Sequence, residues 1–139
     1  MKKRIRMSVL GIVSAVSVLS MMLAGPGAAI GQEGISIEQA VICRDVVERE
    51  PIGSGDIFPA DVSRLCCFTK VVGAGMDTEI VHNWYHDGKM VASVTLPVRS
   101  AKWRTYSSKR ILQNQVGDWM VEILSASGQP LTKIVFIVN

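Results

Sequence analysis

The chain has 139 residues, enough for one domain of ordinary size. Its net charge of +3 depends on the first six positions, which hold four of the 15 Lys and Arg residues and none of the 12 Asp and Glu residues. The remainder has 11 basic and 12 acidic residues and is therefore close to neutral. Because a neutral domain lacks the uniform field that attracts nucleic acids, we expect no nucleic-acid partner.

The N-terminal segment has the composition of an export signal. The basic start is followed by an uncharged apolar run, Met7–Ala24, and then by a stretch rich in glycine and alanine. We expect residues 1–31 to be a signal peptide and residues 32–139 to be a single periplasmic or secreted domain. The alternative is an uncleaved signal anchor, because the run is about as long as the shortest bilayer span, roughly 17–20 residues. That anchor would then be the only membrane contact, with the domain outside.

Beyond this segment, short apolar stretches alternate with turn residues. We predict strands over residues 35–47, 64–72, 79–86, 89–98, 103–107, 119–124 and 131–138. A loop is expected over 48–59, which contains two prolines and two glycines. Beyond an N-terminal signal helix, the only helix expected is a brief one within 108–115. Asp87-Gly88 indicates a two-residue type I′ hairpin turn. This spacing predicts an all-β domain, an immunoglobulin-like antiparallel β-sandwich of about seven strands, with a small open β-barrel as the alternative.

The chain contains three cysteines, Cys43, Cys66 and Cys67. In an oxidising compartment two of them are expected to form a disulfide. Adjacent cysteines rarely bond to each other, because the small ring strains the peptide link. Cys43 is therefore expected to pair with Cys66 or with Cys67. A zinc site would need a second Cys/His pair at ligand spacing, so we expect neither a metal nor another cofactor.

The two histidines, His82 and His86, lie four residues apart and first suggest a metal site. On a strand, however, four residues span about 13 Å, which is too far for two imidazoles to share one ion unaided. We expect Trp84 to pack inside the domain and His82 to form a hydrogen bond beside it. An enzyme that uses His82 and His86, metal-dependent or otherwise, remains an alternative.

Residues 103–110 combine aromatic rings, hydroxyls and three cations. Arg104 and Lys109 could hold a carboxylate or phosphate while Tyr106 or Trp103 offers a stacking face. The structural alternative places Trp103 in the core and Arg104 along Tyr106. The candidate binding face comprises His82, Trp84, Trp103, Arg104, Ser108 and Lys109.

Catalytic motifs are missing from the sequence. There is no Gly-x-Ser-x-Gly element, no Ser-x-x-Lys element and no phosphate-binding glycine loop. We therefore expect no catalytic residues and no enzymatic activity. The expected function is a small extracytoplasmic binding domain whose partner is an unidentified protein or a small anionic ligand. A structural or assembly role in the cell envelope is the alternative.

Several motifs together resemble the bacterial family called domain of unknown function 2914. They are Arg49-Glu-Pro51, Cys67-Phe-Thr69, His82-x-Trp84, Trp103-Arg-x-Tyr-Ser-Ser-Lys109 and Gly117-x-Trp119-x-Val121. The resemblance covers nearly all of residues 36–138. It implies a bacterial extracytoplasmic domain and carries no activity or functional residues with it. Cys66 stands where the family pattern leads us to expect an aromatic residue, so the resemblance favours Cys43–Cys67 as the disulfide.

Overall fold

The computed structural model describes residues 34–139, so the expected signal peptide over 1–31 lies outside the described residues. No helix in the described part is long and apolar enough to cross a membrane. Residues 34–139 form ten strands, which are β1 (Ser36–Cys43), β2 (Asp45–Val47), β3 (Glu50–Ile52), β4 (Ile57–Phe58), β5 (Arg64–Val72), β6 (Thr78–His86), β7 (Lys89–Val98), β8 (Lys102–Arg110), β9 (Gly117–Ser125) and β10 (Pro130–Val138).

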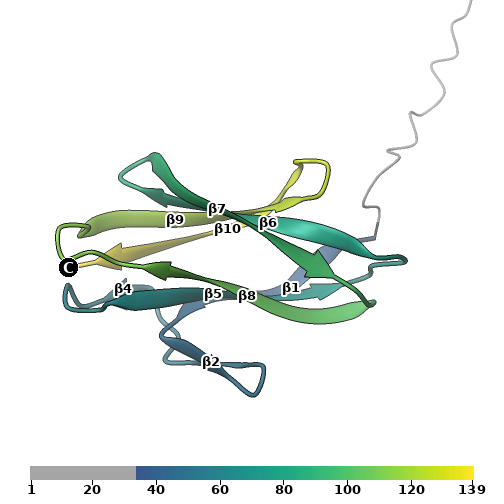
Figure 1. Cartoon of the computed structure of the whole chain (residues 1–139), viewed down its shortest axis with the longest axis horizontal. Coiled ribbons are helices and arrows are strands. Elements are labelled where there is room, and N and C mark those ends of the chain that lie inside the picture. The colour runs from purple at the N-terminus through teal and green to yellow at the C-terminus, as the bar shows by residue number, and fades with distance from the viewer. Residues whose placement is uncertain (1–33) are drawn as a thin grey trace, which may run out of the picture.

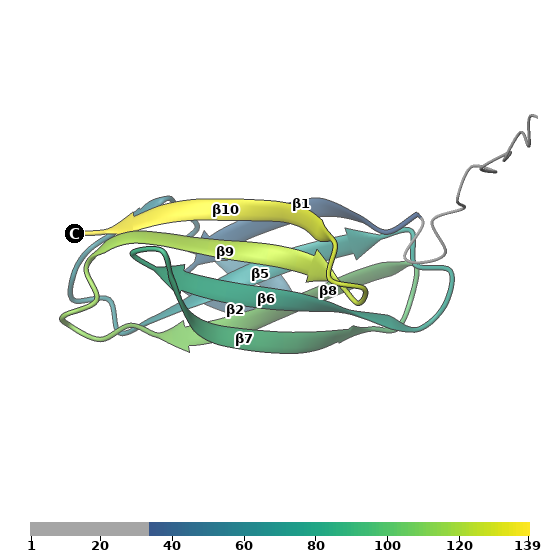
Figure 2. The same ribbon diagram turned by 90° about the horizontal axis from the view of Figure 1, so that it is seen from above.

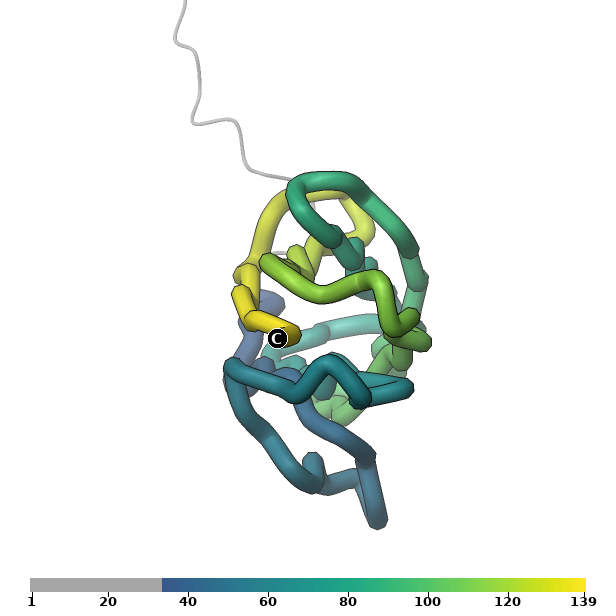
Figure 3. Tube along the Cα trace, turned by 90° about the vertical axis from the view of Figure 1, so that its left-hand side faces the viewer, coloured from purple at the N-terminus to yellow at the C-terminus, as the bar shows by residue number. Residues whose placement is uncertain are grey.

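These strands form two layers packed face to face (Figures 1 and 2). The smaller sheet has the order β1-β5-β8, and the larger sheet has the order β4-β10-β9-β6-β7. A third element, the β2–β3 hairpin, lies against the outer face of the smaller sheet, as the end-on view of Figure 3 shows. The sheets remain separate, which confirms the predicted all-β sandwich.

The longer strands lie where the alternation of apolar residues predicted them. β5 and β7 have the predicted bounds, and the other long strands extend the predicted ranges by one to three residues at their ends. Asp87 and Gly88 have φ values of 48° and 79°, as the expected type I′ turn requires. Residues 108–115 contain no helix, because β8 continues to Arg110 and a loop follows.

Two predictions for residues 35–59 were wrong. The single strand expected over 35–47 is interrupted at Arg44, after which β2 leaves the sheet to form the hairpin. The expected loop over 48–59 contains β3 and β4, and Pro51 lies within β3. Proline is tolerated there because β3 pairs only with β2 and needs no second partner for its backbone.

The inward faces of the two sheets form one apolar core. Trp84, Trp119 and Phe136 are each at most 2% exposed. The Trp119 and Phe136 rings stack with centroids 5.8 Å apart, and Trp84 meets Phe136 edge-on at 6.3 Å. Both tryptophans therefore pack inside the domain, as was predicted for Trp84.

Candidate anion-binding groove

Two residues of the predicted binding face lie inside the sandwich rather than on its surface. His82 and Trp84 are on β6 and are both fully buried. Trp84 Nε1 donates a hydrogen bond to Ser107 Oγ at 3.0 Å, and His82 Nδ1 lies 2.7 Å from the same oxygen. His82 Nε2 lies 2.9 Å from Thr69 Oγ1. These side chains therefore connect β6 with the facing sheet and cannot reach a ligand.

The donor and acceptor roles of the hydrogen bonds in this network can be assigned in one consistent way. Trp84 can only donate, so Ser107 accepts from it and can donate its own proton to His82 Nδ1. His82 Nε2 then carries the ring proton and donates to Thr69 Oγ1. We assign this tautomer because it gives every group a partner.

Burial determines the protonation of the titratable groups in the network. Loss of solvent lowers the pKa of His82 to about 4, so its ring is neutral at pH 7. Burial also raises the pKa of Cys67 to about 12, and the Thr69 hydrogen bond opposes this only in part. The His82 ring is neutral, the Cys67 thiol is un-ionised, and neither has solvent access, so both contribute to packing and are unsuited to catalysis.

The four remaining residues of the predicted face lie on β8, but they do not share one side of it. Arg104 and Ser108 face outward and are exposed, whereas Trp103 and Lys109 have the opposite parity and are partly buried. Lys109 Nζ donates to the backbone oxygen of Arg110 at 2.8 Å. Of the predicted face, only Trp103 and Arg104 line a common cavity.

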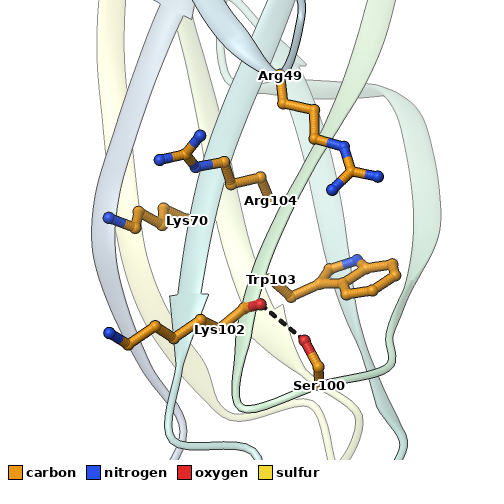
Figure 4. A pocket seen from close by; sticks show the side chains of 6 residues that line it. All are labelled: Arg49, Lys70, Ser100, Lys102, Trp103 and Arg104. Atoms are coloured by element: carbon orange, nitrogen blue, oxygen red, sulfur yellow. Dashed lines mark hydrogen bonds between the residues drawn. The ribbon is translucent and has the colours of Figure 1, made fainter.

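That cavity has a volume of about 480 Å³ and lies at the outer edge of the smaller sheet. We call it the cationic groove, and its lining residues are Arg49, Lys70, Ser100, Lys102, Trp103 and Arg104. Figure 4 shows Lys70, Lys102 and Arg104 extending to one side of β8, with Arg49 and Trp103 on the other. No acidic side chain is among the lining residues.

Acidic residues at the margins of the groove neutralise part of its charge. Lys70 and Arg104 are directly paired across β5 and β8, an unfavourable arrangement for two cations. Glu38 Oε2 lies 2.8 Å from Lys70 Nζ, and Glu50 Oε1 accepts from Arg104 Nη1 at 2.6 Å. The pKa of Glu38 is lowered chiefly by the hydrogen bond from Lys70, with smaller effects from Lys102 and Arg104. The ionised Glu38 carboxylate is therefore stabilised by three of the groove cations.

The other two cations have no such neutralisation. Within residues 34–139, neither Arg49 nor Lys102 has a carboxylate within 4.0 Å. Arg49 belongs to the turn of the β2–β3 hairpin, where Glu48 and Arg49 have φ values of 50° and 63°. Two consecutive non-glycine residues in the left-handed region are strained, and such strain is concentrated at functional segments. This turn places Arg49 over the groove.

A second cavity of about 320 Å³ adjoins the groove and shares Arg49 and Arg104 with it. Its other lining residues are Val46, Phe68, Thr105 and Tyr106, so it offers an apolar and aromatic surface next to the cations. A ligand that carries both an anionic group and a flat apolar part could occupy the two cavities together.

Sequence reasoning missed three of the four groove cations. Lys70 and Lys102 could have been found, because their strand parity is that of Phe68 and Arg104, which face outward. Arg49 could not, because its position depends on the hairpin folding back over the sheet.

The predicted Cys43–Cys67 disulfide is wrong, because the two side chains lie on opposite faces of the smaller sheet. All three cysteines are free and buried in the structure. Cys67 points into the main core, whereas Cys43 and Cys66 share a separate cluster on the other face of the smaller sheet. Adjacent residues on a strand face opposite sides, so Cys66, not Cys67, lies opposite Cys43.

His82 and His86, which were considered as a possible metal site, bind separate partners. Both ring nitrogens of His82 are engaged in the buried network, and His86 Nε2 lies 2.7 Å from the Val116 backbone oxygen. The His86 ring also packs on Trp119, with centroids 4.7 Å apart. Residues 34–139 contain no group of three His, Cys, Asp or Glu side chains suited to a metal ion.

Comparison with known proteins identifies a family resemblance without an assigned activity. Residues 77–138 match the family model described as Protein of unknown function (DUF2914), which confirms the predicted resemblance over this segment. The segment includes β6 to β10 and three of the five motifs noted in the sequence. A search of curated proteins gives no significant match.

Among solved structures, one that matches part of this chain is the crystal structure of a selenomethionine-labelled β-glucosidase from Kluyveromyces marxianus. The identity is 8% and the TM-score is 0.44. The alignment covers 76% of this chain and 14% of the β-glucosidase chain, so this protein spans a small part of that structure's length.

Proposed function

We propose that this protein is a small extracytoplasmic, non-catalytic domain that binds an anionic ligand or an anionic part of a partner protein in the cationic groove. The observation that carries the proposal is that four cations line one cavity of about 480 Å³ in a domain that is nearly neutral as a whole. A local concentration of positive charge on a neutral domain favours selective recognition of an anion over general attraction to polyanions.

The chemistry of the groove favours carboxylate or phosphate groups. Arginine offers a planar fork of donors that matches both groups, and Lys70 lies directly across the strand pair from Arg104. An anion between these two side chains would relieve their mutual repulsion. Trp103 at the margin adds a flat surface for the rest of the ligand.

The extracytoplasmic location is supported by the N-terminal composition: four basic residues, an uncharged apolar run and a small-residue exit. The test is expression of the full chain in a bacterium with a periplasm, followed by fractionation and N-terminal sequencing. We expect the product in the periplasmic fraction with the leader removed, or in the inner membrane with an intact leader. Recovery of the intact chain from the soluble cytosol would exclude this part of the proposal.

Calorimetric titration with inorganic phosphate and with citrate tests the binding proposal. Lys102→Ala and Arg104→Ala should each weaken binding of the better probe by about tenfold, the effect of losing roughly one charge-assisted hydrogen bond. Lys133→Ala is the matched control for Lys102, because Lys133 is an exposed lysine on β10 of the other sheet. Arg110→Ala, at the far end of β8, is the control for Arg104.

Equal weakening by the groove variants and their controls would show that the probes respond to net charge and not to the groove. Absence of binding by both probes at low ionic strength would also contradict the proposal. Raising the salt concentration should weaken genuine binding, because exposed charges are screened over about 10 Å at 0.1 M salt.

A structural or assembly role is the second candidate, and the edge of the larger sheet is the observation that favours it. β7 is the outermost strand of that sheet, it extends over ten residues, and Met90 and Val91 on it are exposed. Such an edge can pair with a strand of another chain. Lys89 and Pro97 near its ends oppose this pairing, so we rank this role below anion binding.

A further inference from the structure

Two cysteines lie in register on the outer face of the smaller sheet. Cys43 is the last residue of β1, and its Cα partner in β5 is Cys66. Directly opposed residues of an antiparallel pair have Cα atoms about 4.5 or 5.5 Å apart. Both separations fall within the roughly 4.4–6.8 Å that a disulfide spans. The backbone therefore already has the spacing that a bond between these residues requires.

The side chains of this pair are enclosed together. Cys43, Cys66 and Phe68 form a small buried cluster, against which Val46 of the hairpin packs. Both cysteine side chains are fully buried in it. This cluster is separate from the main core, to which Cys67 belongs.

We propose that Cys43 and Cys66 form a disulfide bond that fixes the base of the β2–β3 hairpin to β5. The bond would join the strand that precedes the hairpin directly to the strand beneath it. It would stand beside contacts that already attach the hairpin, namely the packing of Val46 and the half-exposed Asp45–Arg64 ion pair at 3.3 Å.

The oxidation needs an external disulfide, and a small-molecule disulfide such as oxidised glutathione suffices. The Cys66 thiolate attacks one sulfur of that reagent, which forms a mixed disulfide and releases one glutathione thiolate. Cys43 then loses its proton and attacks Cys66 Sγ, releasing the second glutathione. Two protein thiols are oxidised, and one disulfide reagent is reduced to two thiols.

The surroundings favour Cys66 as the first nucleophile. Its pKa is lowered mainly by the hydrogen bond from the Cys43 thiol and further by the charge of Arg64. The same hydrogen bond and burial raise the pKa of Cys43. Cys67 faces the opposite side of β5 and points into the main core, so in the folded domain it is not a partner for Cys43.

The consequence concerns the mobility of the hairpin. Arg49 and Glu50 lie at its tip, and they contribute a cation and an acidic partner to the cationic groove. Closing the loop from residue 43 to residue 66 restricts the unfolded chain and holds the hairpin base against the sheet. The disulfide does not depend on what the groove binds.

The test is refolding of the full chain from denaturant in a buffer of reduced and oxidised glutathione, so that burial in the native state does not block access. Remaining thiols are then alkylated in denaturant and counted by intact mass. We expect one alkyl group on the wild type, at Cys67, and none on Cys67→Ala. After reduction, these counts should rise to three and two. The oxidised protein should also show a higher midpoint of urea unfolding than the reduced protein.

Peptide mapping of the wild type identifies the bonded pair even if Cys67→Ala folds poorly. Cys43→Ala and Cys66→Ala are the matched variants, and each should form only mixed disulfides with glutathione. Three free thiols in the refolded wild type, or a bond that involves Cys67, would overturn the proposal.

Discussion

His82 Nδ1 on β6 lies 2.7 Å from Ser107 Oγ on β8, and this buried polar contact joins the two layers of the sandwich. Ser107 is also the acceptor for the indole N–H of Trp84. The Ser107 hydroxyl is therefore a hydrogen-bond partner for both His82 and Trp84, which have no access to water. Such a group is costly to remove, because both of its partners would be left unpaired.

Ser107→Ala should lower the free energy of unfolding by about 2 kcal/mol or more, since loss of partners for a buried donor costs roughly 1–3 kcal/mol. Ser108→Ala is the matched control: it removes the same atom one residue further along β8, on the exposed side. That variant should differ from wild type by less than about 0.5 kcal/mol. Urea unfolding measures both, and equal effects would contradict the network.

Acid should destabilise the domain through His82. Its pKa is about 4 in the folded state and about 6.5 when the chain is unfolded, so the unfolded state binds the proton more tightly between these values. The contribution of the neutral His82 ring to the free energy of unfolding has its full value above pH 6.5. It decreases as the pH falls, and the free energy of unfolding is lower by about 3 kcal/mol at pH 4. His82→Gln should lack this component, whereas His86→Gln should retain it. Urea unfolding measured from pH 7.5 to 4 distinguishes the two variants.

Glu50→Gln should strengthen anion binding in the cationic groove. The Glu50 carboxylate accepts from Arg104 at 2.6 Å and competes with any external anion for that guanidinium. Both side chains are exposed, so the change should alter the free energy of unfolding by less than about 1 kcal/mol. Titration with the probe that binds wild type tests the prediction. An unchanged or weaker affinity would indicate that Glu50 does not compete with the ligand.

Gly73→Ala should be strongly destabilising. Gly73 has a φ of 88°, and an added Cβ would lie 1.8 Å from the backbone oxygen of Gly34, which cannot rotate away. Left-handed geometry alone costs an alanine about 1–2 kcal/mol, and the clash adds to it. Gly75→Ala is the control, because a Cβ there meets nothing within 4 Å. A thermal melt of both variants should show a large loss only for Gly73→Ala.

The sequence was sufficient for the architecture because the long strands alternate apolar and polar residues. In the strand predicted over residues 119–124, Trp119, Val121 and Ile123 alternate with less buried neighbours, and all three are buried. The same alternation could not reveal the β2–β3 hairpin. It contains a proline and turns without a glycine at Glu48 and Arg49, so neither composition nor turn residues indicate it.

The candidate site was harder to predict, because residues near each other in sequence were assumed to share a face. Arg104 and Lys109 were grouped by proximity, but they have opposite parity on β8. Lys102 lies two residues from Arg104 on the same side of β8, so parity alone would have grouped them. Lys70 lies opposite Arg104 only because β5 pairs with β8. The register between distant strands depends on the whole fold, and one sequence does not specify it.

The division of β5 and β8 into an inner and an outer side also bears on how this domain can change over time. The inner side contributes Thr69 and Ser107 to the contacts between the layers, and the outer side contributes Lys70 and Arg104 to the groove. Substitution of the outward-facing residues Lys70 and Arg104 leaves the contacts between the layers intact, so a change of ligand in the proposed groove requires only the exchange of a few surface charges. Two domains of this architecture can therefore share their folding determinants while recognising chemically unrelated molecules.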